Sequence, residues 1–311
     1  MPVRRQVAAL VAGLAMVVTG CASSGSAGGS GAAPTGSGSS GSGLPPGGDP
    51  MQLVGLWRLD APGQAKGSIL RLGDDLSLWS DCGYLMGQWD ADSEGLFVGH
   101  VDGGSQACMP KAPGDPTPDW LAKVTAFRAD ASGAQLLDPA GAVVARLMPG
   151  GHPTAGPDVA AALASPPAVT DELRARFGPA PSLPAGLTAA TPDRLLGRWG
   201  AADTPQLRGF VELAADGSWT GSDGANAQHG RWAADSSGNL VAVSGAQTLI
   251  GCMPNSCVDA GNWFVTASRA AFDGTTLVLI DTAGKVTGRL AHAVAPTPVP
   301  PVSPPPAGSG S

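Results

Sequence analysis

Cysteine has the widest range of chemistry of any residue type in this chain, because a thiol can carry a lipid, pair in a disulfide, bind a metal or attack a substrate. The sequence has five cysteines, and Cys252 and Cys257 stand only five residues apart. A metal site on this Cys-x-x-x-x-Cys pair would need a third and a fourth ligand close by. The surrounding sequence supplies neither, so the spacing favours disulfide chemistry over metal or redox chemistry.

Histidines and carboxylates form no catalytic pattern in the sequence. The histidines show no His-x-x-x-His or His-x-x-Glu spacing, so we expect each to be solvated or hydrogen-bonded; they are His100, His152, His229 and His292. Most aspartates stand at turns, where Asp stabilises the local backbone; examples are Asp74, Asp75, Asp216, Asp235 and Asp273. The sequence has no phosphate loop, nucleotide fingerprint or nucleophile–base motif. We therefore predict no catalytic residue, no metal and no cofactor, with a hydrolase that has no recognisable motif as an alternative.

The first cysteine, Cys21, ends an export sequence. Two arginines precede an apolar run from Val7 to Val18, which is too short to span a bilayer well. The run ends in Val18-Thr19-Gly20-Cys21, which resembles the bacterial lipobox, whose cysteine is lipidated and becomes the mature N-terminus. We predict a lipoprotein signal peptide at residues 1–20 and a lipid-anchored chain on the extracytoplasmic face of the cell membrane. The arginine pair alone does not decide between the Sec and twin-arginine routes.

Both ends of the chain lie outside the predicted folded part. Residues 21–51 are rich in Gly and Ser, a composition typical of a flexible tether. Residues 294–311 are rich in Pro, and we expect them to be disordered. Removal of the two signal-peptide arginines takes the formal charge from −7 to −9. An acidic chain is a poor partner for nucleic acid and for electrostatic adhesion to anionic lipid.

The folded part is a tandem repeat. A Gly-x-Trp segment, a second Gly-x-Trp segment, a Cys-Met-Pro triplet and a late tryptophan recur in the same order, at offsets between 141 and 144 residues. The matched pairs are Trp57 and Trp199, Trp89 and Trp232, Cys108 and Cys252, and Trp120 and Trp263. We predict two domains, the first copy at 52–149 and the second at 194–293, joined by a Pro/Ala-rich linker at 150–193.

Each copy is predicted to consist mainly of short antiparallel strands with one amphipathic helix. Thr117 is the expected N-cap of the first helix, whose apolar positions are Trp120, Leu121, Val124 and Phe127. The strands expected in the first copy are Val54–Leu59, Ser68–Leu72, Leu76–Ser80, Gly87–Ala91, Leu96–Val101, Gln135–Asp138 and Val143–Met148. In the second copy they are Phe210–Leu213, Ser218–Gly221, Arg231–Ala234, Leu240–Ser244, Thr276–Ile280 and Val286–Leu290, with a helix near Gly261–Ala270.

The linker is predicted to contain two short helices that can dock on either copy. Asp158 is a candidate cap for the first, and Thr170 for the second, with Gly178 ending it. A structureless segment of this length would be unusual inside one compact domain, so the linker supports a domain boundary.

The order of elements resembles the META domain, the family that includes HslJ-type bacterial lipoproteins. That family has a Gly-x-Trp strand, then a Gly-Cys-Asn-x-x-x-Gly-x-aromatic segment, a second cysteine, a helix and two strands. The first copy has Asp81-Cys82-Gly83 in the middle segment, and the second copy has Gly224-Ala225-Asn226. The resemblance covers both domains and implies an all-β dominated fold, with two tandem small antiparallel META-like β-domains and one packed helix in each.

Four cysteines remain after Cys21, and they allow three pairings. The resemblance implies the pair Cys82–Cys108 in the first copy. In the second copy Ala225 replaces the first cysteine of the pattern, and Cys257 supplies a new partner close to Cys252. We therefore predict the disulfides Cys82–Cys108 and Cys252–Cys257.

Tryptophans are the remaining candidates for a ligand site. Those that recur in both copies are expected in the cores. Trp79 and Trp219 lie on matching strands but are shifted by one residue, which turns them to opposite faces. We expect one of the two to be exposed, and we take both as candidates for a ligand contact.

These patterns together predict a membrane-anchored extracytoplasmic lipoprotein whose tandem β-module binds without catalysis. Besides the membrane itself, the expected partner is an envelope protein or a cell-wall component; the sequence leaves the oligomeric state open. A small-ligand carrier with an apolar pocket inside one calycin-like β-domain is a second hypothesis.

Overall fold

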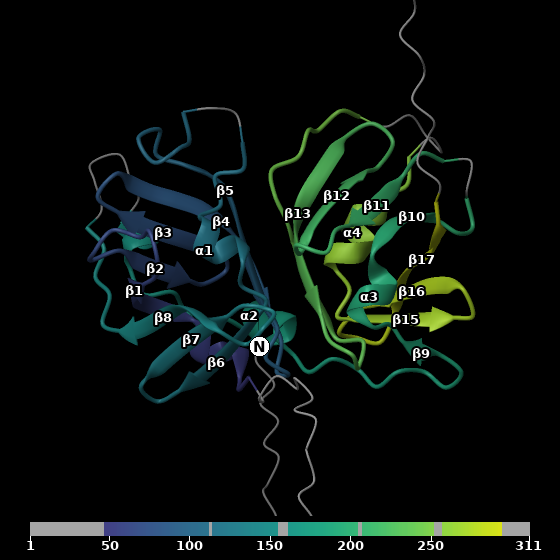
Figure 1. The fold of residues 1–311 in the computed structure, drawn as a ribbon, viewed down its shortest axis with the longest axis horizontal. Helices are drawn as coiled ribbons and strands as arrows, with labels where there is room; N and C mark the ends of the chain where they lie inside the picture. Colours follow the sequence, from purple (N-terminus) through teal and green to yellow (C-terminus); the bar gives the residue numbers. More distant parts are fainter. Residues whose placement is uncertain (1–46, 112–113, 155–160, 205–206, 252–256, 294–311) are drawn as a thin grey trace, which may run out of the picture. The chain divides into compact units, whose positions relative to one another are not determined.

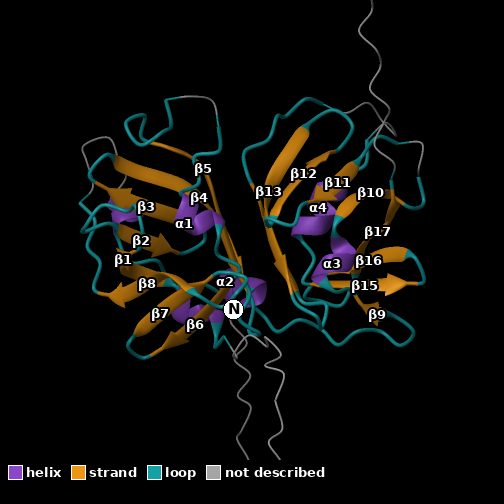
Figure 2. Ribbon diagram, viewed as in Figure 1, coloured by secondary structure: helices purple, strands orange, loops and turns teal. Residues whose placement is uncertain are grey.

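The computed structural model describes residues 47–111, 114–154, 161–204, 207–251 and 257–293. These residues belong to one unit, Ser42–Ser311. They form two antiparallel sheets with a few short helices, so the fold is dominated by β-structure, as predicted (Figure 2). Among the described residues, no helix is long and apolar enough to cross a membrane.

The first sheet contains the strands of the first copy in the order β5-β4-β3-β2-β1-β8-β7-β6 (Figure 1). Its strands are β1 (Gly55–Asp60), β2 (Ile69–Leu72), β3 (Leu76–Ser80), β4 (Gly83–Ala91), β5 (Phe97–Gly104), β6 (Ala126–Asp130), β7 (Gly133–Leu137) and β8 (Val143–Pro149). The two outermost strands meet at a single antiparallel bridge between Leu96 and Ala126. Phe127 N–H also donates to the Gly95 carbonyl, at 2.8 Å, so the sheet curves round until its edges join.

The second sheet repeats this order with one added strand: β14-β13-β12-β11-β10-β17-β16-β15-β9. Its strands are β9 (Thr188–Ala189), β10 (Gly197–Ala201), β11 (Phe210–Leu213), β12 (Ser218–Ser222), β13 (Ala227–Ala234), β14 (Leu240–Ser244), β15 (Arg269–Asp273), β16 (Thr276–Ile280) and β17 (Val286–His292). A bridge between Asn239 and Arg269 joins β14 to β15, at the place that corresponds to the closing bridge of the first sheet.

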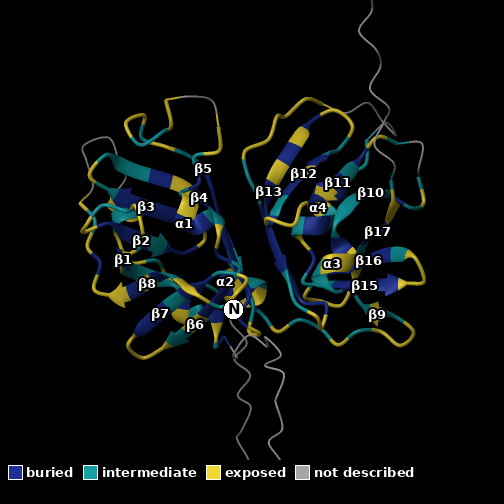
Figure 3. Ribbon diagram, viewed as in Figure 1, coloured by how far each residue is buried: buried dark blue, intermediate teal, exposed yellow. Residues whose placement is uncertain are grey.

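Large side chains fill the space enclosed by each sheet. In the first sheet the core includes Trp89, Phe97 and Phe127, each at most 1% exposed. In the second, Trp199 and Phe264 are equally buried. Buried residues continue along the strands, while exposed ones gather in the connections (Figure 3).

One detail recurs almost atom for atom in the two copies. The Trp57 indole N–H donates to the Leu53 carbonyl at 2.7 Å, and the Trp199 indole N–H donates to the Leu195 carbonyl at the same distance. Each tryptophan therefore closes the turn that leads into the first strand of its sheet, as the sequence match between the two segments would require.

The helix predicted after Thr117 is much shorter than expected. It is α1 (Asp119–Ala122), and Phe127 belongs to strand β6 instead. Thr117 is not its N-cap, because the cap position is Pro118, and the Thr117 hydroxyl accepts from Val101 N–H at 3.0 Å. The second copy differs from expectation in the same way, with a short α4 (Ala260–Val265) followed by β15. The apolar spacing that suggested one long helix is divided between a helix and a strand.

The linker contains helices, as predicted, and one of them packs on the first copy. Thr170 Oγ1 accepts from Leu173 N–H at the start of α2 (Asp171–Arg176), which confirms the predicted cap. Leu173 and Phe177 join the first core, and the Phe177 ring lies 4.7 Å from that of Trp89. Asp158 lies outside the described residues. Three further short helices are η1 (Pro50–Leu53), η2 (Ala161–Ala164) and α3 (Pro192–Leu195).

Candidate functional site

Strands β4 and β5 of the first copy contact strands β13 and β14 of the second, and we call this region the junction. Its centre is an apolar cluster with no side chain more than 6% exposed: Leu96, Val98, Ala233, Val241 and Val243. This cluster is separate from the two cores. The junction gathers most of the strongly perturbed titratable groups of the chain, so it is the first place to look for chemistry.

An arginine crosses the junction on one side of the apolar cluster. The guanidinium of Arg231 in β13 donates to the Ala122 carbonyl of the first copy and to the Asp216 carbonyl, the latter at 2.8 Å. Burial lowers the pKa of Arg231, and the charges of Asp216 and Asp115 oppose this effect. The arginine therefore bonds to backbone oxygens of both copies and holds them together.

A second set of charged groups lies at the end of β4. Arg176, the last residue of α2 in the linker, has its Nε 3.5 Å from Oδ1 of Asp90 and also donates to the Trp89 carbonyl. The Asp90 carboxylate accepts from the Ala242 N–H of β14. Burial raises the pKa of Asp90 to about 6, although Arg176 lowers it in part.

Asp92 organises the β4–β5 turn and keeps one oxygen without a partner. Its Oδ1 accepts from Glu94 N–H at 3.1 Å and from Leu96 N–H at 2.8 Å. Its Oδ2 is buried and makes no hydrogen bond. Burial raises the pKa of Asp92 to about 7, and the nearby carboxylate of Asp235 adds to the rise.

The opposite end of the junction holds two histidines that are far apart in the sequence. His100 of β5 is 1% exposed, and its ring meets that of His229 of β13 edge to face, with centroids 5.2 Å apart. Nε2 of His100 lies 3.6 Å from Oδ1 of Asp102. Burial lowers the pKa of His100 to about 4 and raises that of Asp102 to about 6. His100 is therefore neutral at pH 7.

Thr117, His100 and Asp102 stand in the order of a hydroxyl–imidazole–carboxylate triad, which is the arrangement that the hydrolase hypothesis requires. Thr117 Oγ1 lies 3.2 Å from Nδ1 of His100. However, Thr117 is only 9% exposed, and its hydroxyl already accepts a backbone hydrogen bond. A general base also works best with a pKa near the working pH, and that of His100 is about 4. The geometry favours a structural role for the three groups.

The same groups do not form a metal site. Across the described part of the chain, no group of three or more histidines, cysteines and carboxylates is arranged to hold a metal ion. His152 and His292 lie away from the junction. His292 packs its ring 3.9 Å from that of Trp199, and His152 is exposed.

Beside the junction lies a cavity of about 1040 Å³, which we call the cleft. Residues of both copies line it, with an apolar floor that includes Leu96, Leu196 and Trp232. Six carboxylates also line the cleft, against two basic side chains, Lys123 and Arg231; they are Glu94, Asp119, Asp138, Asp193, Asp216 and Asp235. None of the six makes an ion pair with a described residue. A smaller cavity of about 380 Å³ lies on the side of Asp90 and Asp92.

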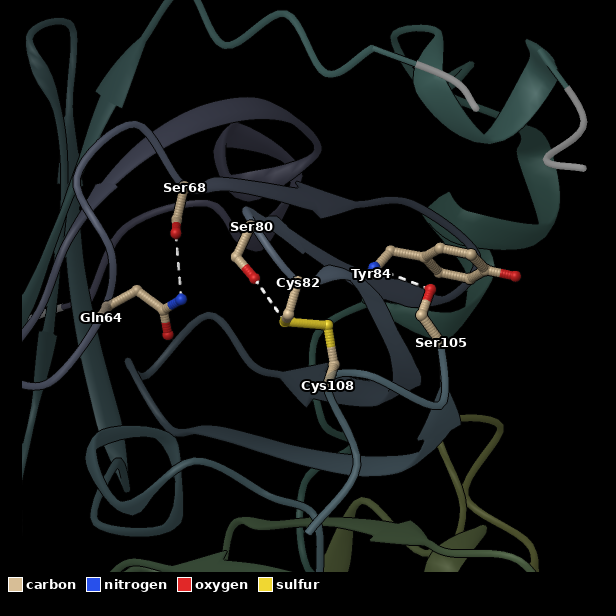
Figure 4. Close-up of a disulfide and its surroundings, with 7 residues drawn as sticks. All are labelled: Gln64, Ser68, Ser80, Cys82, Tyr84, Ser105 and Cys108. Carbon is tan, nitrogen blue, oxygen red and sulfur yellow. Dashed lines mark hydrogen bonds between the residues drawn. A yellow bond between two sulfur atoms is a disulfide. The ribbon is translucent and has the colours of Figure 1, made fainter. Parts of the chain in front are cut away.

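The disulfide predicted in the first copy is confirmed. Cys82 and Cys108 are bonded at 2.02 Å, and Ser80 Oγ lies 3.0 Å from Sγ of Cys82 (Figure 4). Cys257 is also disulfide-bonded. Its predicted partner, Cys252, lies outside the described residues, as does Cys21.

The two tryptophans taken as ligand candidates point to opposite faces, as predicted, but neither is exposed. Trp219 belongs to the second core and is 1% exposed, and its indole N–H donates to the Val243 carbonyl at 2.9 Å. Trp79 lies outside the first core although its strand neighbours Leu76 and Leu78 lie within it. It is 7% exposed, and its ring stacks on that of Tyr84, with centroids 5.2 Å apart. The expectation of an exposed tryptophan is wrong, and neither ring lines the cavities described above.

The junction could not be found from short sequence motifs. Its histidines and aspartates come from different strands of both copies, and no short spacing connects them. One signal was available: the aspartates that begin the β4–β5 and β13–β14 turns, Asp92 and Asp235, are matched in the repeat. That match marks equivalent turns, but it does not show that the turns face each other.

Comparison with known proteins does not assign the chain to a group: no protein-family model matches it, and neither the curated proteins nor the solved structures give a significant match. The resemblance to the META domain therefore stays a prediction.

Proposed function

We propose that this chain is a lipoprotein anchored through Cys21 on the extracytoplasmic face of the membrane, and that its two β-domains form a non-catalytic binding module. The partner that fits best is a basic segment of another envelope protein. We further propose that the two domains are divergent META-like copies, which the curved antiparallel sheet with one packed helix in each copy supports.

The cleft is the observation that carries this proposal. It is large enough for several amino-acid residues, and both copies line it, so a bound segment would contact both domains at once. Its floor is apolar and its six carboxylates outnumber its two basic groups. This combination is complementary to lysine or arginine side chains on an otherwise apolar segment.

Two other functions have less support. A carrier would hold its ligand inside one β-domain, whereas in both sheets the inward-facing side chains form a large buried apolar cluster. A hydrolase would need an accessible nucleophile, whereas the hydroxyl closest to His100 is buried and already hydrogen-bonded. The binding module requires neither.

The cleft can be tested by filling it. Ala215 is exposed and lines the cleft, so Ala215→Trp should block a bound segment without disturbing a core. Ala283 is exposed in the turn before β17 and does not line the cleft, so Ala283→Trp is the matched control. The measurement is native mass spectrometry of the ectodomain, residues 22–311, with a panel of basic and acidic peptides. We expect basic peptides to bind the parent and Ala283→Trp, and to bind Ala215→Trp at least tenfold more weakly. Equal binding of acidic and basic peptides would refute the proposal.

The anchor is tested separately. Cys21→Ala should release the protein from the membrane fraction or leave its precursor uncleaved. A mature, membrane-bound Cys21→Ala protein would refute the anchoring part and leave the cleft untouched.

A further inference from the structure

Buried side chains of the second copy hold the loop that follows β14 in place. Asn226, which is 6% exposed, donates through Nδ2 to the Ile250 carbonyl at 2.9 Å and accepts from Ile250 N–H through Oδ1 at 2.5 Å. Its Nδ2 also donates to Oδ2 of Asp223, at 2.7 Å. Gln228, equally buried, donates to the side chain of Gln247 at 3.1 Å. Buried amides thus fix residues 245–251 at two points, and we call this segment the clamped loop.

The clamped loop presents two aliphatic side chains to solvent. Leu249 is 87% exposed and Ile250 is 61% exposed, and no other large hydrophobic residue described is as exposed as either. The loop sequence Gly-Ala-Gln-Thr-Leu-Ile-Gly contains no charged residue. A loop fixed by buried side chains does not lose much conformational freedom on binding, so the burial of Leu249 and Ile250 has a small entropic cost.

We propose that Leu249 and Ile250 insert into the hydrocarbon edge of the membrane to which the chain is attached, and so fix the orientation of the module at the surface. This inference rests on the proposed lipid anchor. It assigns a lipid-binding role to the clamped loop that is separate from peptide binding in the cleft.

The length of chain before the folded part makes the bilayer the favoured occupant. Cys21 and Gly47, where the described chain begins, are 26 residues apart in a Gly/Ser-rich sequence, and the flexible coil that this composition predicts would span roughly 30 Å. Such a tether keeps the loop at a local concentration on the order of millimolar near the lipid. Two aliphatic side chains bind a bilayer too weakly to recruit a free protein, but at that concentration a weak contact is occupied.

The charged groups near the clamped loop indicate which lipid headgroups favour insertion. Three carboxylates border the loop on the protein side. Asp102 accepts from the backbone of Ala246, Asp223 accepts from Asn226 Nδ2, and Asp259 accepts from Gln228 Nε2 at 2.8 Å. Hydrogen bonds from Asn226 and Ala225 lower the pKa of Asp223, against burial, so it stays ionised at neutral pH. The insertion is therefore apolar rather than electrostatic, and anionic lipid should weaken it.

The experiment places an environment-sensitive fluorescent amino acid at position 249 of the lipidated full chain in phosphatidylcholine vesicles. The control places the same residue at position 286, because Val286 is an exposed aliphatic residue (43%) on β17. We expect a blue-shifted emission at position 249 that brominated phosphatidylcholine quenches, and water-like emission at position 286. Ile250→Ser in the chain labelled at 249 should lower the inserted fraction about tenfold. Replacing half of the lipid by phosphatidylglycerol at low salt should also lower it.

Two outcomes would overturn the inference. The first is water-like emission at position 249 while the chain is on the vesicles. The second is a blue shift at 249 without vesicles that grows with protein concentration, because a second copy would then cover the loop. If the chain does not associate with vesicles through Cys21, the proposed anchor fails instead. The ectodomain, held on nickel-chelating lipid by an N-terminal His tag, then tests the loop alone by the same emission.

Discussion

The two copies fasten the same region in different ways. In the first copy the segment after β3 is tied to the segment after β5 by the disulfide Cys82–Cys108. In the second copy Ala225 takes the place of Cys82, and its neighbour Asn226 ties the segment after β14 by hydrogen bonds to Ile250. A disulfide in the first copy and a buried amide in the second therefore fasten equivalent loops from matching positions.

The comparison shows what the fold requires and what it leaves free. In both sheets the tie holds a long connection between a strand and the short helix that follows it, at residues 105–118 after β5 and 245–259 after β14. The chemistry of the tie is free to change, since a disulfide acts mainly on the unfolded chain while the amide acts through polar contacts in the folded one. The second solution also leaves Leu249 and Ile250 exposed.

The largest expected effect comes from removing the covalent tie. Cys82→Ala with Cys108→Ala opens a loop of sequence separation 26, which should lower the free energy of unfolding of the first copy by about 3.5 kcal/mol. Denaturant unfolding, followed separately for the two copies by hydrogen exchange, measures it. The second copy should be unaffected, and a loss below about 1 kcal/mol in the first would show that the tie is dispensable.

Removing the amide tie should have a somewhat smaller effect. Asn226→Ala deletes three hydrogen bonds and leaves the Ile250 backbone groups without their partner, so we expect a loss of about 2 kcal/mol in the second copy. Faster exchange of the Ile250 amide is the direct reporter. Asn262→Ala, at an exposed position on α4, serves as the control and should change stability by less than about 0.5 kcal/mol. Equal losses of stability in the two variants would show that Asn226 does not tie the loop as the disulfide does in the first copy.

Replacing the equivalent turn residues Asp92 and Asp235 by asparagine should change the free energy of unfolding in opposite directions. In the second copy Oδ2 of Asp235 accepts from Asn239 Nδ2 at 2.7 Å. In the first copy Leu96 stands at the place of Asn239, and Oδ2 of Asp92 has no partner. A carboxyl whose pKa is higher in the folded chain destabilises the fold as the pH rises. For Asp92 this loss occurs between about pH 4 and pH 7, since its folded pKa is about 7.

Asp92→Asn should therefore raise the free energy of unfolding at pH 8 by about 1 kcal/mol and flatten its decline between pH 4 and pH 7. Asp235→Asn should instead lower it by about 1 kcal/mol at neutral pH, because it gives up a charge-assisted bond. Thermal unfolding across this pH range checks both, and two changes of the same sign would contradict the assignment.

The smallest difference is expected between the shifted tryptophans. Both Trp79→Phe and Trp219→Phe remove buried ring volume, but only Trp219 has a hydrogen-bonded indole N–H. Trp219→Phe should therefore cost about 1 kcal/mol more than Trp79→Phe. Urea denaturation of the two variants decides it, and equal costs would mean that the bond to the Val243 carbonyl contributes nothing.

Much of the fold could be predicted from the sequence because strand periodicity and turn residues are local properties. Leu76–Ser80, Phe210–Leu213, Leu240–Ser244 and Thr276–Ile280 begin and end in the structure where the apolar pattern places them. Strands β6 and β15 could not be predicted, since Phe127 continues the helical spacing of Trp120 although the chain has already turned. Local spacing does not show where a helix stops when no glycine or proline marks its end.

The candidate site could not be predicted from local patterns, because its residues meet only through contacts between distant parts of the chain. The disulfide of the first copy followed from the family resemblance. The junction did not, because His100 meets His229, and Asp92 approaches Asp235, only after both sheets have formed and packed. The same holds for the clamped loop. Asn226 stands in a recognisable motif, but the backbone groups of Ile250 to which it bonds are 24 residues away in the sequence.

The junction has the geometry of a symmetric homodimer held in a single chain. Strands β5 and β14 are counterparts in the repeat and contact each other, and β4 contacts β14 as β13 contacts β5. In a true homodimer every substitution would appear twice across such an interface. Here His100 has Val243 as its counterpart and Asp102 has Gly245, and a side chain at Gly245 would clash with both histidines. Because both copies belong to one chain, the two halves of this contact surface can differ from each other, so that the junction joins unlike partners where a homodimer would join identical ones.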